Sequence, residues 1–171
     1  ARDAVNYLRE IMEEIGLEVH EYEAGNVIGI LRGTDPDAPC VMSGSHYDSV
    51  IHGGNYDGIG GVVCSIEMAR QIVESGMEHK RDLVVVGFND EEGMRFGTGY
   101  FGSGAMLGHR DEPYTKQFKD ASGISIAEAM KEYGLDPAKV GDAAWKEGSI
   151  GHFVEAHIEQ GPVLDQKELE I

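Results

Sequence analysis

Two short apolar runs separated by a long amphipathic segment limit the topology of this chain more than any other part of its sequence. The first run begins a buried strand at residues 40–42. From residue 59 to residue 73 apolar side chains recur every three or four positions, which is the spacing of a helix packed on a sheet. Residues 83–88 (LVVVGF) are a continuous apolar run typical of a central strand. This order favours a right-handed crossover, and it predicts an α/β fold with a mixed, largely parallel sheet flanked by helices.

The sequence before this unit predicts one helix and a hairpin. Apolar residues at helical spacing indicate a helix over residues 4–15, which Gly16 would end. Short strands are expected over residues 17–22 and 26–31, with a turn at residues 24–25 between them.

The sequence after this unit predicts one helix and one strand. The helix is expected over residues 124–133. Alternating residues over 153–159 predict a strand that carries Glu155, His157 and Glu159 on one face.

Charge and composition exclude several classes of protein. The 171 residues include 14 basic and 31 acidic side chains, a formal net charge of −17, so nucleic-acid binding through basic patches is nearly excluded. No apolar run approaches the roughly 18 to 20 residues needed to cross a bilayer, and no leader opens the sequence. We therefore expect a cytoplasmic protein without a membrane partner, with Cys40 and Cys64 as reduced, buried thiols.

Polar side chains stand where both central strands end. His46 follows the first strand, Glu91 and Glu92 follow the second, and Asp57 lies just before the intervening helix. In open α/β sheets ligands bind outside the carboxyl ends of the strands. Imidazole and carboxylates without a nearby thiolate are a ligand set for Zn²⁺, Mn²⁺, Co²⁺ or Ni²⁺. These residues therefore suggest a metal site, which His157 could join from a third strand.

Each of these residues also has a purely structural explanation. A single histidine is more often a packed or surface residue than a metal ligand, and adjacent glutamates usually lie in a solvated turn. Glu91 and Glu92 directly follow an apolar strand, however, and the repulsion of two crowded carboxylates is hard to explain without a cation. Asp48 could form a turn, or it could accept the proton of the His46 imidazole and orient the ring.

Four segments, in order and spacing, match a known family. They are residues 44–50 (GSHYDSV), 53–58 (GGNYDG), 90–96 (DEEGMRF) and 155–162 (EAHIEQGP). Together they resemble the N-carbamoyl-L-amino acid hydrolase, allantoate amidohydrolase and β-ureidopropionase family. This family lies within the wider clan of dinuclear metallohydrolases that includes aminoacylase and carboxypeptidase G. The resemblance covers nearly the whole chain.

The resemblance implies a site for two divalent ions. Asp57 would bridge them, His46 and His157 would complete the ligands of the first ion, and Glu92 would bind the second. The ions would be zinc, manganese, cobalt or nickel. The resemblance further implies a cis peptide bond between Asp57 and Gly58.

The same resemblance assigns roles in catalysis. Glu91 would be the general base, and Asp48 would hydrogen-bond to His46. Gln160 would contact the carbamoyl or amide group of a small-molecule substrate.

Members of this family are more than twice as long as this chain. They carry a lid and dimerisation domain, and a further histidine ligand of the second ion, beyond the region that matches. We therefore expect residues 1–171 to be a single partial catalytic domain with one complete and one incomplete metal site. On its own it should be inactive, whereas the full-length enzyme should form a homodimer through the domain that is absent here.

The expected activity is hydrolysis of a ureido or carbamoyl C–N bond, in an N-carbamoyl amino acid or allantoate, by a metal-activated water. Two alternatives remain. The first is a peptidase or aminoacylase of the same clan, although those relatives carry a carboxylate where this chain has His157. The second is a metal-binding fragment without turnover.

Overall fold

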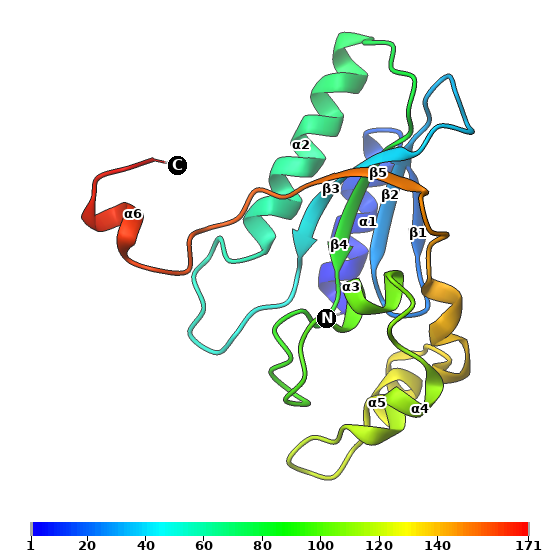
Figure 1. The fold of residues 1–171 in the computed structure, drawn as a ribbon, viewed down its shortest axis with the longest axis vertical. Helices are drawn as coiled ribbons and strands as arrows, with labels where there is room; N and C mark the ends of the chain where they lie inside the picture. Colours follow the sequence, from blue (N-terminus) through cyan, green and yellow to red (C-terminus); the bar gives the residue numbers. More distant parts are fainter. Residues whose placement is uncertain (1, 171) are drawn as a thin grey trace.

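The structure, a computed structural model, describes residues 2–170, and its centre is a five-stranded mixed sheet (Figure 1). The strands are β1 (Glu18–Glu21), β2 (Val27–Leu31), β3 (Cys40–His46), β4 (Leu83–Phe88) and β5 (Ile150–Val154). Their order across the sheet is β1-β2-β4-β3-β5. Strand β3 is parallel to β4 and β5, whereas β2 is antiparallel to β1 and β4. The predicted α/β class, the mixed sheet and the strand–helix–strand unit are confirmed, with antiparallel pairing confined to the β1–β2–β4 side.

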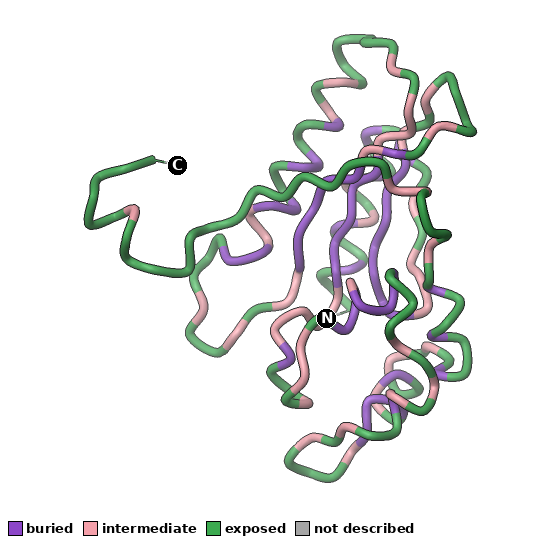
Figure 2. The backbone as a smooth tube through the Cα atoms, viewed as in Figure 1, coloured by how far each residue is buried: buried purple, intermediate pink, exposed green. Residues whose placement is uncertain are grey.

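Two amphipathic helices, α1 (Arg2–Glu14) and α2 (Ile59–Ser75), cover one face of this sheet. Their apolar residues recur at the predicted helical spacing, so each helix presents one apolar stripe to the strands. The main buried contributors are Val5, Leu8 and Met12 from α1, Val62, Ile66 and Ala69 from α2, and Val27 and Val85 from the sheet. Figure 2 shows this buried interior running through the central strands.

The opposite face is covered at one end by a group of short helices. These are α3 (Phe101–Met106), α4 (Glu112–Gln117), α5 (Ile126–Tyr133) and the 3₁₀ helix η1 (Pro137–Ala143), which share their own apolar cluster. The sequence predicted α5 but neither α3, which lies in a glycine-rich stretch, nor α4. The sequence did contain a residue typical of a helix start, Asp111. In the structure its side chain accepts the Tyr114 amide hydrogen and so caps the N-terminus of α4.

The C-terminal part departs from the predicted strand. Strand β5 ends at Val154, which pairs with Ser43, and the chain then leaves the sheet (Figure 1). The expected strand over residues 153–159 is therefore wrong beyond Val154. Glu159 instead accepts amide hydrogens from Val163 and Leu164 at the start of α6 (Val163–Gln166).

Two smaller expectations concern the cysteines and membrane association. Both thiols are free, but only Cys40 is buried, whereas Cys64 is exposed on α2. The expectation that both are buried is wrong because position 64 lies on the side of α2 away from the sheet. Among residues 2–170, no helix has the length and apolar character that crossing a bilayer requires.

Candidate metal centre

Three side chains from distant parts of the sequence converge at the carboxyl end of β3. His46 is the last residue of β3, Asp57 lies in the loop before α2, and His157 follows β5. One ligand atom from each lies within 4.8 Å of the other two. His46 Nε2 is 3.3 Å from His157 Nε2 and 3.7 Å from Asp57 Oδ1, and His157 Nε2 is 3.5 Å from Asp57 Oδ1. The predicted convergence is confirmed.

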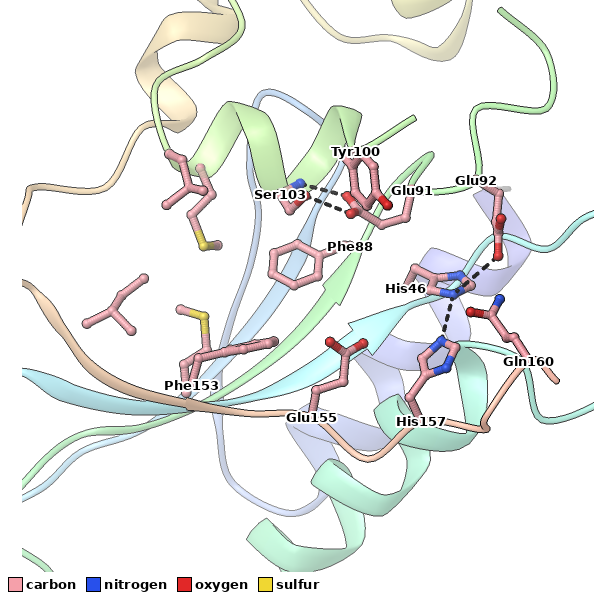
Figure 3. Close-up of a pocket in the computed structure, with 14 residues that line it drawn as sticks. His46, Phe88, Glu91, Glu92, Tyr100, Ser103, Phe153, Glu155, His157 and Gln160 are labelled. Atoms are coloured by element: carbon pink, nitrogen blue, oxygen red, sulfur yellow. Dashed lines mark hydrogen bonds and ion pairs between the residues drawn. The ribbon is translucent and has the colours of Figure 1, made fainter. Parts of the chain in front are cut away.

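Both imidazoles are held so that their Nε2 atoms face this centre (Figure 3). His46 Nδ1 lies 2.9 Å from the carbonyl oxygen of Asp48, and His157 Nδ1 lies 2.9 Å from that of Ile158. A carbonyl oxygen only accepts, so each Nδ1 donates and, in the neutral ring, each Nε2 carries a lone pair. Two such lone pairs 3.3 Å apart repel unless a proton or a cation lies between them. The donor set, two imidazole nitrogens with a carboxylate, therefore fits a divalent transition-metal ion.

Asp48 controls the charge of His46. Its carboxylate beside the imidazole raises the pKa of His46 to about 9, although burial opposes the charged ring. Burial alone would raise the pKa of Asp48, but the His46 imidazole, 3.5 Å from its Oδ1, and hydrogen bonds from the Glu91 and Glu92 amides hold the pKa below its usual value. Without an ion, a proton on His46 therefore partly balances the carboxylates around it.

Asp48 also joins the ends of β3 and β4. Its Oδ1 accepts the Glu91 amide hydrogen at 3.1 Å, and its Oδ2 accepts the Glu92 amide hydrogen at 3.0 Å. Glu92 Oε1 then lies 3.6 Å from His46 Nε2. The structure thus places the Asp48 and Glu92 carboxylates beside the imidazole, but the hydrogen bond expected between His46 and the Asp48 side chain goes to the Asp48 backbone carbonyl.

The Glu91 side chain points to a partner that the sequence pattern did not indicate. Its Oε1 accepts the backbone N–H of Ser103 and its Oε2 accepts the Ser103 hydroxyl, both at 2.7 Å (Figure 3). Burial raises the pKa of Glu91, and the two bonds from Ser103 partly oppose that effect. Ser103 lies in α3, inside a glycine-rich stretch whose pattern gave no sign of a helix.

Glycine is required directly after Asp57. Gly58 has φ +69°, and a Cβ built on it would overlap the His46 ring. The peptide bonds of the described residues are all trans, so the cis bond expected between Asp57 and Gly58 is wrong. In this structure the crowding is relieved by the positive φ and the missing side chain of Gly58.

Gln160 lies at the site but contacts a protein group. Its Nε2 donates to Asp57, at 3.1 Å from Oδ1 and 3.4 Å from Oδ2. The side chain therefore reaches the metal centre from the segment after His157, with a backbone φ of +56°.

An open cavity of about 670 Å³ adjoins the metal centre. Its acidic side carries Glu91, Glu92 and Glu155, and Figure 3 shows Glu155 pointing into it from the same segment as His157. The sequence pattern predicted Glu155 on a strand face and indicated no role for it. The apolar wall comprises Met42, Phe88, Met106, Leu107, Ile150 and Phe153.

Comparison with known proteins gives consistent matches. The model of peptidase family M28 matches residues 26–123. The chain is 46% identical to the N-carbamoyl-L-amino acid amidohydrolase of Geobacillus stearothermophilus, over 99% of this chain and 41% of that protein. It is 39% identical to the allantoate amidohydrolase of Bacillus subtilis, over 95% of this chain and 39% of that protein.

A solved structure shares the fold. The crystal structure of AtUAH in complex with (S)-hydroxyglycine superposes with a TM-score of 0.87 at 33% identity, covering 98% of this chain and 41% of that one. The chain thus spans about two fifths of the length of the curated relatives it matches.

Proposed function

Because this chain belongs to peptidase family M28, we propose that it is the metal-binding part of an amidohydrolase that cleaves a ureido or carbamoyl C–N bond. The proposed substrates are N-carbamoyl amino acids and allantoate, which follow from the names of the relatives. The observation that carries the proposal is the meeting of His46, Asp57 and His157 beside a cavity that also holds Glu91.

His46, Asp57 and His157 would hold one divalent ion, and Asp57 with Glu92 would contribute to a second, incomplete site. Zinc, manganese, cobalt and nickel all suit these nitrogen and oxygen ligands. A bound ion supplies polarisation of the substrate carbonyl and lowers the pKa of water.

The chain's own residues would divide the remaining work. Glu91 would take the proton of the attacking water and return it to the leaving nitrogen. The burial that raises its pKa makes Glu91 a stronger base than an exposed glutamate, which suits a group that accepts and then donates a proton. Asp48 would fix the position of the Glu91–Glu92 turn relative to His46. Gln160 would exchange its hydrogen bond to Asp57 for one to the substrate's carbamoyl or amide group.

A peptidase or aminoacylase activity is the second candidate, and the description of the matching family favours it. Both reactions need the same kind of metal-activated water, so the metal centre does not separate them. The distinction lies in the substrate, and the printed names of the curated relatives favour the ureido and carbamoyl class.

Substrate profiling would test this proposal. A protein of the relatives' full length, loaded with Mn²⁺ or Zn²⁺, would be assayed with N-carbamoyl amino acids, allantoate, N-acyl amino acids and dipeptides. We expect ureido and carbamoyl substrates to be cleaved with a kcat/KM at least about tenfold higher than acyl and peptide substrates. Preference for acyl or peptide bonds would support the second candidate. The 171-residue chain assayed alone would test its expected inactivity.

The homodimer, which the family resemblance implies, and the cytoplasmic location, which is expected from the sequence itself, are part of the same proposal. Light scattering of the full-length protein would test the dimer.

A further inference from the structure

His157 reaches the metal centre from a segment without regular secondary structure. Strand β5 ends at Val154, and residues 155–159 belong to no helix or strand. The Nδ1 bond of His157 goes to the neighbouring carbonyl of Ile158, so it orients the ring only relative to its own backbone. A ligand on such a segment needs another attachment to the fold if its position is to be fixed.

One attachment is a side-chain hydrogen bond two residues before His157. The Ser45 hydroxyl donates to Glu155 Oε1 at 2.5 Å. Ser45 is completely buried in β3, directly before His46. The bond therefore ties the segment that carries His157 to the residue next to the other imidazole ligand.

A close backbone approach lies beside this bond. Gly61, in the first turn of α2, is buried, and a Cβ built on it would overlap the carbonyl oxygen of Ala156 and crowd Ser45 Cβ. The segment can thus lie directly on α2 while Glu155 reaches Ser45. Figure 3 shows Glu155 and His157 leaving this segment toward the same cavity.

We propose that Ser45 and Glu155 form a positioning pair that fixes His157 for metal binding. Glu155 positions His157 by accepting the Ser45 hydrogen bond, and its negative charge does not contribute to this positioning. The pair replaces the strand hydrogen bonds that end at Val154. This inference rests on the metal site of the proposed function and on no particular substrate.

The expected effect is on metal affinity. Outer hydrogen-bond partners of metal ligands typically change affinity by about 10- to 100-fold when they are removed. Ser45→Ala and Glu155→Ala should each weaken Co²⁺ binding to the 171-residue chain within that range. Because they remove the same bond, the double variant should lose little more than either single variant.

Two further variants separate positioning from other effects. Glu155→Gln keeps an oxygen that accepts the Ser45 hydrogen bond but removes the charge, so its affinity should stay within about threefold of the parent chain. Ser43→Ala is the matched control, since Ser43 is buried on the same strand and its hydroxyl shares a 2.8 Å bond with Ser65 rather than with Glu155. It should leave Co²⁺ affinity unchanged.

The measurements are Co²⁺ titration followed by visible absorption, which reports ligand geometry, and thermal unfolding of each metal-free variant. Equal Co²⁺ affinity and spectra in the parent chain, Ser45→Ala and Glu155→Ala would overturn the positioning role and leave the proposed function intact. An equal loss in Glu155→Gln and Glu155→Ala would also overturn it, because charge would then be the cause. Failure of the parent chain to bind Co²⁺ would instead contradict the metal site and with it both proposals.

Discussion

Replacing Asp48 by asparagine should remove most of the pH dependence that His46 gives to the metal-free protein. The Asp48 carboxylate lies 3.5 Å from His46 Nδ1 and is the main reason that the pKa of His46 rises to about 9. An asparagine amide is neutral and nearly the same size. The pKa of His46 should therefore fall back toward its usual value of about 6.5.

The sign and size follow from proton linkage. The pKa of folded His46 lies above its value in the unfolded chain, so the protonated ring stabilises the folded state. That contribution is complete below about pH 6.5 and is lost as the pH rises through about 9. The difference between these pKa values corresponds to at most about 3 kcal/mol in the free energy of unfolding. Asp48→Asn should lower stability at every pH as well, because one of two amide hydrogens loses its acceptor.

Urea unfolding in the presence of EDTA would measure this effect at about pH 6 and about pH 9.5. Between these values the parent chain should lose up to about 3 kcal/mol more stability than Asp48→Asn. Asp37→Asn, an exposed carboxylate in the loop before β3, is the charge-matched control and should follow the parent chain. If Asp48→Asn shows the same pH dependence as the parent chain, Asp48 does not control the protonation of His46.

Three further outcomes are expected. In the full-length enzyme, Glu91→Gln should keep metal content while kcat falls at least about 100-fold, whereas Glu92→Gln should also lower metal content; metal analysis showing the reverse would exchange the two roles. Gly61→Ala should weaken Co²⁺ binding although alanine favours helices by about 1 kcal/mol, because its methyl group meets the Ala156 carbonyl; unchanged affinity would show that the segment can shift freely. Met12→Ala, at a fully buried position between α1 and the sheet, should lower the free energy of unfolding by about 2 to 5 kcal/mol in urea titration, and a loss below about 1 kcal/mol would contradict the core assignment.

Local patterns in the sequence account for the framework of this protein. Apolar spacing along α1 and α2 and the continuous run of β4 are properties of neighbouring residues, so they can be recognised without the fold. The position of His46 and Glu92 at strand ends followed from the same patterns, because parallel strands bring their carboxyl ends to one edge. The candidate metal ligands were proposed from this placement together with the family motifs.

The tertiary structure decided what depends on contacts between distant residues. The alternation over residues 153–159 suggested one strand, but β5 ends at Val154 because the chain then docks on Gly61 and Ser45, about 100 residues earlier. The contact between Glu91 and Ser103 could not be predicted for the same reason, because Ser103 lies in a helix formed by a glycine-rich stretch. Periodicity reports which face of an element is buried, but it carries no information on which distant segment that face will meet.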